Sequence, residues 1–110
     1  MQQIYNWNEL EEKMNRKKEM VLLKHSNTCP RSAKAYEECM LFEQNREVPV
    51  YYLVVQESRS FSNEIANRFQ VAHQSPQIFY IKEGKVVWEA HHWDITEAKL
   101  TEAQKVADIG

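Results

Sequence analysis

The residues best suited to chemistry lie together in one short segment, Thr28-Cys29-Pro30-Arg31-Ser32. An apolar run precedes this segment and a helical pattern follows it, so we expect Cys29 at the N-cap of a helix and Pro30 at its first position. The free backbone N–H groups of Arg31 and Ser32, together with the helix dipole, then favour a thiolate over a thiol. The charge of Arg31 and a hydrogen bond from the Ser32 hydroxyl strengthen this effect. The segment therefore predicts a reactive cysteine rather than a buried structural one.

A dithiol redox site needs a second thiol close to the first, and the sequence places none near Cys29. The position where such a thiol would stand is Ser32, and the only other cysteine is Cys39. On one helix the two cysteines are about 15 Å apart along the axis, whereas a disulfide needs Cα atoms within about 7 Å. Cys39 also falls in line with Ala35 and Phe42 on an apolar stripe. We therefore predict a core position for Cys39 and a monothiol site, in which Cys29 forms a mixed disulfide that another thiol resolves.

Helix and strand patterns alternate along the chain and must position this segment. The expected elements are helix 8–18 capped by Asn8, strand 20–25, helix 30–45, strand 50–55, helix 58–69 capped by Ser58 or Ser60, strands 77–82 and 85–91 joined by Glu83-Gly84, and a last helix capped by Thr96. The first two strands flank a helix and should be parallel, whereas the last two form a hairpin. The pattern predicts one α/β domain over residues 1–110, with a four-stranded mixed sheet and helices on both faces. This order is common in the thioredoxin fold.

Composition and charge exclude several classes of function. The formal net charge is −2, from 14 basic and 16 acidic residues, so we expect no strongly basic face for a nucleic acid. No uncharged apolar run approaches the ~20 residues of a membrane span, and the polar residues 1–18 do not resemble a secretory signal. The adjacent His91 and His92 should face opposite ways, and no Cys/His spacing is typical of a zinc site. We expect a cytoplasmic monomer that binds no metal, membrane or nucleic acid.

Several segments resemble the monothiol bacilliredoxins of the YtxJ type, over about residues 5–105. The Thr-Cys-Pro-x-Ser site at 28–32 carries the resemblance, and it is accompanied by Tyr51–Gln56 with Glu57-Ser58-Arg59, by Gln74-Ser75-Pro76-Gln77, by Trp88, and by His92-Trp93-Asp94-Ile95-Thr96. The resemblance implies a thioredoxin fold in which Cys29 removes bacillithiol from S-bacillithiolated proteins in the cytosol. Bacillithiol is then a low-molecular-weight co-substrate, and no cofactor stays bound. The sequence does not indicate which proteins are substrates or what recycles Cys29.

The resemblance to thioredoxin-like folds also implies a substrate groove that faces Cys29. In that fold a cis-proline precedes the next strand and lies opposite the active cysteine, and Pro76 takes this place. We therefore expect the Ser75–Pro76 peptide bond to be cis, although cis is a minority form. The backbone of Ser75 can then pair with an extended substrate chain. His73 lies in the same loop and is a candidate for the groove wall.

Four more side chains are candidates for the groove or for the thiolate. Thr28 lies directly before the cysteine. Arg59 begins the helix after the second strand, where it and Arg31 can face the malate carboxylates of bacillithiol, unless Arg59 serves only its own helix. Trp93 can form an apolar wall, although packing in the core is the simpler expectation. His25 either lies beside the site as an imidazolium that favours the thiolate or is a surface residue at a strand end.

A different class of function stays open at this point. Monothiol glutaredoxins hold a bridging [2Fe–2S] cluster with a low-molecular-weight thiol as co-ligand, so the chain could be a binding module. Their site usually reads Cys-Gly-Phe-Ser, with glycine leaving room beside the cysteine. Pro30 and Arg31 replace those residues here, which counts against a cluster. A redox-inactive, thioredoxin-like adaptor is a third interpretation, which an unreactive Cys29 would favour.

Overall fold

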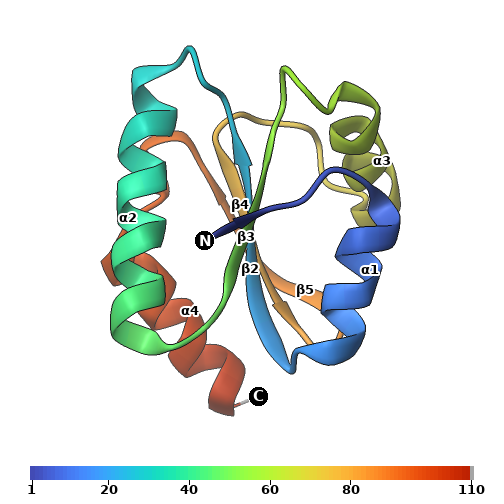
Figure 1. Ribbon diagram of the computed structural model, residues 1–110. Helices are drawn as coiled ribbons and strands as arrows, with labels where there is room; N and C mark the ends of the chain where they lie inside the picture. The colour runs from blue at the N-terminus through green and yellow to red at the C-terminus, as the bar shows by residue number, and fades with distance from the viewer. Residues whose placement is uncertain (110) are drawn as a thin grey trace.

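A twisted mixed sheet forms the centre of the computed structural model, which describes residues 1–109 (Figure 1). The three strands at one side of the sheet are parallel, and the last two run antiparallel to their neighbours. In spatial order the strands are β1 (Gln2–Gln3), β3 (Val50–Val54), β2 (Glu19–His25), β4 (Gln77–Lys82) and β5 (Lys85–His91). β2 is the central strand, so the segment that follows it leaves from the middle of the sheet.

Helices cover both faces of this sheet, as the sequence predicts. Figure 1 shows α2 and α4 on one face and α1 and α3 on the other. The helices are α1 (Trp7–Arg16), α2 (Pro30–Arg46), α3 (Arg59–Phe69) and α4 (Glu97–Ile109), with a short 3-10 helix, η1 (His92–Asp94), before the last. The expected α/β architecture with a thioredoxin-like order is confirmed. Among residues 1–109, no helix combines the length and the apolar character needed to cross a bilayer.

The sheet has five strands, so the expectation of four strands is wrong. The additional strand, β1, consists of two glutamines that pair in parallel with Tyr51 and Tyr52 of β3. Ile4 continues this pairing through a backbone hydrogen bond to Tyr52 O (2.8 Å) and is fully buried. The pairing is made by backbone groups, and both side chains of the strand are polar. Gln2 and Gln3 therefore lack the alternating apolar pattern that predicts a strand.

The expected caps are partly confirmed. Helix α1 begins one residue before the predicted position, because Asn6 rather than Asn8 is its N-cap and accepts a hydrogen bond from Glu9 N at 2.9 Å. At the start of α4, Thr96 Oγ1 accepts from Lys99 N (3.1 Å), as expected. Ser58 is the N-cap residue of α3, but its side chain makes no capping hydrogen bond.

Successive residues of β2 pack into two different cores, which explains why the strand is a continuous apolar run. Val21 and Leu23 belong to a core that includes residues of α2 and α4. Met20 and Leu22 belong to a second core, which includes residues of α1 and α3. Cys39 is fully buried in the first core, so its predicted role as a core residue is confirmed.

Lys24 is an exception among the buried residues of β2. Its side chain is 0% exposed, although lysine is almost never fully buried without a charged partner. The ammonium forms no salt bridge with a carboxylate in the described part of the chain. Burial lowers the pKa of Lys24 from 10.5 to about 8. The sequence placed Lys24 and His25 on opposite faces but did not show that the lysine is the buried one.

We predict that Lys24→Met raises the free energy of unfolding at pH 7, by about 1 kcal/mol, because it replaces a buried charge with an apolar side chain of similar length. Between pH 8 and 10.5 the unfolded chain holds more protons at Lys24 than the folded chain, so the stability of the parent rises with pH there. The advantage of the variant should therefore shrink across this window. Chemical denaturation of both proteins at pH 7, 8, 9 and 10 measures the difference in their free energies of unfolding. A difference that does not change with pH would contradict the predicted role of Lys24.

Candidate active site

Cys29 lies where the chain passes from the central strand β2 into α2. It is the N-cap residue of α2 in extended backbone conformation, and Pro30 occupies the first turn, as predicted. The first turn contains no acidic residue, so no carboxylate competes for its positive end. The side chain of Arg31 lowers the pKa of the Cys29 thiol, and the backbone N–H groups of Ser32 and Arg31 add to this effect. The thiol is partly exposed, so a disulfide can reach it.

Ser32 supports the loop rather than donating its hydroxyl to the sulfur. Its side chain is fully buried, and Oγ accepts a hydrogen bond from the backbone N of Ser26 at 3.2 Å. Within residues 1–109 no hydrogen bond links this hydroxyl to Cys29. The expected hydroxyl contact is therefore replaced by a backbone one, and the side chain fixes the start of the loop to α2.

Gln56, two residues after the end of β3, holds the loop that carries the cysteine, and sequence reasoning gave it no role. Its Nε2 donates to Ser26 Oγ (2.7 Å) and to Thr28 Oγ1 (3.3 Å), and its Oε1 accepts from Asn27 N (3.3 Å). A single exposed glutamine after a strand has no distinctive pattern, so only the fold reveals that it reaches the neighbouring loop. Thr28 therefore accepts a hydrogen bond from Gln56 and also directly precedes Cys29.

The loop before β4 is the segment that the resemblance leads us to expect opposite Cys29. The Ser75–Pro76 peptide bond is cis, as expected. The carbonyl oxygen of Pro76 accepts a hydrogen bond from His92 N at 2.9 Å, which ties this loop to η1. Burial lowers the pKa of the His92 imidazole, and the charge of Arg31 lowers it further. The backbone of His92 therefore ties the loop with Pro76 to η1, which packs against α2.

The conformation of His92 explains why two sequence-based expectations about this region are wrong. His92 has a positive φ of 56° and ends the strand, so its ring lies 5.2 Å from that of His91 instead of facing away from it. The turn also leaves Trp93 63% exposed, rather than packed in the core. Trp93 is therefore free to contact a partner. No group of three or more His, Cys, Asp or Glu in the described residues is arranged to hold a metal ion.

His25 packs against aromatic rings and does not supply a positive charge to the thiolate. Its ring centroid is 5.2 Å from that of Tyr36 and 6.4 Å from that of Tyr52. Burial lowers the pKa of His25, and the Ser32 backbone offsets this only in part. The imidazole is thus neutral near pH 7, so the interpretation of His25 as an imidazolium is not supported.

Arg59 and His73 lie on the side of the site formed by α3. Arg59 is the first residue of α3 and lines a shallow hollow of about 470 Å³, together with Tyr5 and Gln56. No salt bridge engages Arg59 within the described residues. Nδ1 of His73 lies 3.1 Å from Nζ of the buried Lys24, so the His73 ring contacts a side chain of β2. Gln56 connects the hollow to the loop before Cys29.

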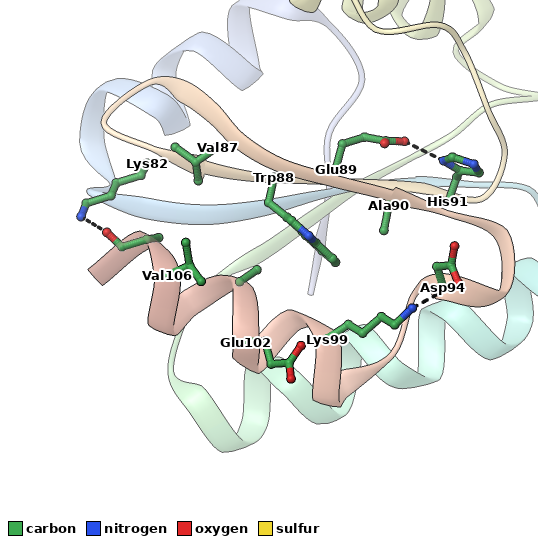
Figure 2. Close-up of a pocket in the computed structure, with 12 residues that line it drawn as sticks. Lys82, Val87, Trp88, Glu89, Ala90, His91, Asp94, Lys99, Glu102 and Val106 are labelled. Carbon is green, nitrogen blue, oxygen red and sulfur yellow. Dashed lines mark hydrogen bonds and ion pairs between the residues drawn. The ribbon is translucent and has the colours of Figure 1, made fainter. Parts of the chain in front are cut away.

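A second cavity, of about 660 Å³, lies between β5 and α4 and is separate from these residues (Figure 2). Trp88 projects from β5 toward α4 inside it, and Ala103 and Ala107 form part of the opposite wall. None of the predicted site residues lines this cavity.

Cys39 cannot act as a resolving thiol from its position in the core. It is fully buried, and burial raises the pKa of its thiol to about 12. The two cysteines are both free, with Cys29 partly exposed at the N-terminus of α2 and Cys39 inside it. The site geometry is therefore that of a single reactive thiol.

A family model described as the monothiol bacilliredoxin BrxC matches residues 1–100. The chain belongs to the monothiol bacilliredoxin family. A solved protein described as a candidate oxidoreductase with a thioredoxin fold is 38% identical, with a TM-score of 0.90 over 93% of this chain and 91% of that one. As a bacilliredoxin with this fold, the protein is a thiol oxidoreductase.

More distant thioredoxins share the bacilliredoxin's fold. The thioredoxin of Fasciola hepatica is 20% identical, with a TM-score of 0.76 over 96% of this chain and 97% of its own. A thioredoxin mutant from Halobacterium salinarum is 14% identical, with a TM-score of 0.77 over 91% and 83% of the two chains. At these identities the likeness shows the fold alone. The bacilliredoxin has this fold around a site with one accessible cysteine.

We predict that Cys29 of this bacilliredoxin alkylates with a pH midpoint below that of an unstructured cysteine peptide in the same buffer. Arg31→Ala should raise the midpoint, because the Arg31 side chain is the largest cause of the lowered pKa. Lys34→Ala is the matched control, since Lys34 is exposed on the same helix and paired with Glu38. Iodoacetamide rates on the Cys39→Ala background measure this, at low and high salt. Equal midpoints for Arg31→Ala and its parent would contradict the assigned cause.

Proposed function

We propose that the protein removes bacillithiol from mixed disulfides between bacillithiol and other proteins, in the cytosol, using Cys29 alone. The observation that carries this proposal is the contrast between its two thiols. Arg31 and the N-terminus of α2 lower the pKa of the partly exposed Cys29, whereas Cys39 is buried with its pKa raised to about 12. A site of this kind exchanges one disulfide for another and cannot close an internal one.

The reaction consists of two thiol–disulfide exchanges. The thiolate of Cys29 attacks the bacillithiol sulfur of the substrate disulfide, a new S–S bond forms, and the substrate protein leaves as a thiolate that takes a proton from water. Cys29 then carries bacillithiol. A second bacillithiol thiolate attacks the carried sulfur, releasing oxidised bacillithiol and the Cys29 thiolate. The same groups that lower the Cys29 pKa make it a good leaving group in this second step.

The groove offers complementary groups to a small anionic thiol. Bacillithiol carries a malate group. Arg31 acts on the thiol, and Arg59 lines the adjoining hollow. The backbone of Ser75, beside Pro76, is available for the peptide-like part of a ligand or for an extended substrate chain. The mixed disulfide would then lie between Arg31 and Ser75. The same wall admits either a small thiol or the main chain of a substrate protein.

We expect Cys29→Ser to abolish removal of bacillithiol from a bacillithiolated test protein, because it replaces the attacking sulfur. Cys39→Ala should keep nearly all the activity and lose about 1 kcal/mol of stability, from one small buried side-chain truncation. Release of substrate thiol, followed by intact-mass spectrometry, measures both. An inactive Cys39→Ala protein that remains folded by circular dichroism would overturn the monothiol mechanism.

The charges of Arg31 and Arg59 should matter for anionic ligands. We expect the double variant Arg31→Ala/Arg59→Ala to slow exchange with bacillithiolated protein more than exchange with hydroxyethyl disulfide, which is neutral. The difference should be about tenfold or less, since exposed charges act weakly. Comparing the two substrates cancels the effect of Arg31 on the thiolate itself.

A matched control lies at the other ends of the same helices. Arg46→Ala/Arg68→Ala removes the same total charge from the C-terminal turns of α2 and α3. It should change neither rate selectively, provided that circular dichroism shows a folded protein. Equal losses on both substrates in the Arg31/Arg59 variant, or none, would show that these arginines do not recognise the charge of the ligand.

A further inference from the structure

The buried Lys24 meets the groove loop through His73. Its Nζ donates to the backbone carbonyl oxygen of Ser62 on α3 at 3.0 Å and lies 3.1 Å from His73 Nδ1. The hydroxyl of Ser62 is 3.3 Å from the same ring nitrogen. Three elements therefore converge on the ammonium, namely β2, α3 and the loop that leads to Pro76. None of these contacts takes part in the mechanism described above.

The contact fixes the protonation state of His73. An ammonium has only N–H donors, so the Nδ1 atom 3.1 Å away must accept, and the ring proton of the neutral imidazole lies on Nε2. A second proton on Nδ1 would make the N–H of His73 face an N–H of Lys24. It would also bring two positive charges to hydrogen-bond distance. The contact between Lys24 and His73 is thus compatible only with neutral His73.

The other charged group that acts on His73 reinforces this restriction. Burial is the largest cause that lowers the pKa of His73, and the charges of Lys24 on β2 and Arg59 on α3 lower it further. Both are cations, and no salt bridge joins His73 or Lys24 to a carboxylate within residues 1–109. On β4, the ring centroid of Phe79 lies 6.0 Å from Lys24 Nζ, and Gln77 is the strand partner of Lys24. The carboxylate of Glu89 on β5 contacts Gln77 and His91, and it pairs with neither Lys24 nor His73. Nothing described in the cluster would compensate a second charge.

The β4 side of the loop is held by the side chain of Gln77 and by a backbone bond of His92. The side chain of Gln77 accepts from Gln74 N (3.1 Å) and donates to Ala72 O (3.1 Å), and His92 N donates to the carbonyl of Pro76. These bonds hold the ends of the segment on its β4 side. Gln77 Nε2 also donates to Glu89 Oε2 (2.9 Å) on β5, and that oxygen lies 3.0 Å from Nδ1 of His91, so the His91 ring is linked to this side of the loop. The contact with Lys24 is the anchor on the opposite side, toward β2 and α3.

We propose that Lys24 is a positioning residue for the substrate groove: through neutral His73 it anchors the loop that carries Ser75 and Pro76, and protonation of His73 releases that anchor. This inference rests on the proposed function, because the loop forms the wall opposite Cys29. His73 is itself exposed, so the protonated ring can turn toward water. The groove wall is then ordered at neutral pH and loosened in acid. The buried lysine, which costs stability, thereby has a role in ordering the site.

Two variants isolate the two partners of the anchor. Lys24→Met removes the ammonium, so the His73 ring should titrate at higher pH than in the parent. His73→Asn keeps an acceptor oxygen for Lys24 but cannot take a proton, so the anchor should persist in acid. His91→Asn, the same substitution, tests the competing route, because the His91 ring lies 3.0 Å from Glu89 Oε2, which also accepts from Gln77 Nε2 at 2.9 Å.

The first readout is an NMR titration of the ring signals of His73 and the amide signal of Ser75 on the Cys39→Ala background. In the parent the Ser75 amide should shift with the same midpoint as His73. The common midpoint should move to higher pH in Lys24→Met, and the shift of Ser75 should be lost in His73→Asn but kept in His91→Asn. An unmoved His73 midpoint in Lys24→Met, or a Ser75 titration retained in His73→Asn, overturns the proposal.

The second readout is the rate of exchange with bacillithiolated protein divided by the alkylation rate of Cys29, which removes the titration of the thiolate itself. The ratio should fall in acid for the parent and stay level for His73→Asn, whereas Lys24→Met should lose part of the ratio at neutral pH while gaining stability. A parent that exchanges at no pH would contradict the proposed function, and the NMR titration would still decide the role of Lys24. An acid loss that persists in His73→Asn contradicts the anchor.

Discussion

The interaction of the Cys29 sulfur with the positive end of α2 is the constraint on which the site depends. The guanidinium of Arg31 and the backbone N–H groups of the first turn act on the sulfur together, and each requires Cys29 to be the N-cap residue. That position is held from two sides. The buried β2 fixes where the chain leaves the sheet, and Gln56 clamps the connecting loop through three side-chain hydrogen bonds. Loosening either support would move the sulfur relative to the helix dipole.

The same helix explains why the chemistry needs an outside thiol. Cys39 lies on the inner face of α2, where its burial in the core raises its pKa to about 12. Bringing it to Cys29 would require α2 to unfold, since a disulfide closes only over about 7 Å between Cα atoms. A single accessible thiol therefore carries its adduct until another molecule removes it. The loop that carries Ser75 and Pro76 is held separately, by Gln77, His92 and, through His73, the buried Lys24.

Local signals predicted the features that depend on local physics. The order of a buried run, Cys29 and Pro30 was enough to place the cysteine at a helix start. The cis bond before Pro76 was expected only from the resemblance to thioredoxin-like folds, because cis is a minority form that local sequence does not indicate. The sequence could not reveal β1, because Gln2 and Gln3 pair through their backbones. It misplaced Trp93, because one left-handed residue, His92, turns the chain outward. Gln56 and Lys24 act across the fold, on partners distant in sequence, so no spacing along the chain indicates their roles.

A single-turnover experiment tests the central claim most directly. Reduced protein is mixed with one equivalent of a bacillithiolated substrate protein in the absence of any other thiol, and intact masses are followed with time. The account predicts that the substrate loses bacillithiol while the enzyme gains one bacillithiol per chain on Cys29, and that this adduct persists until bacillithiol is added. Release of free bacillithiol, with an enzyme lighter by two hydrogens from a Cys29–Cys39 disulfide, would contradict it.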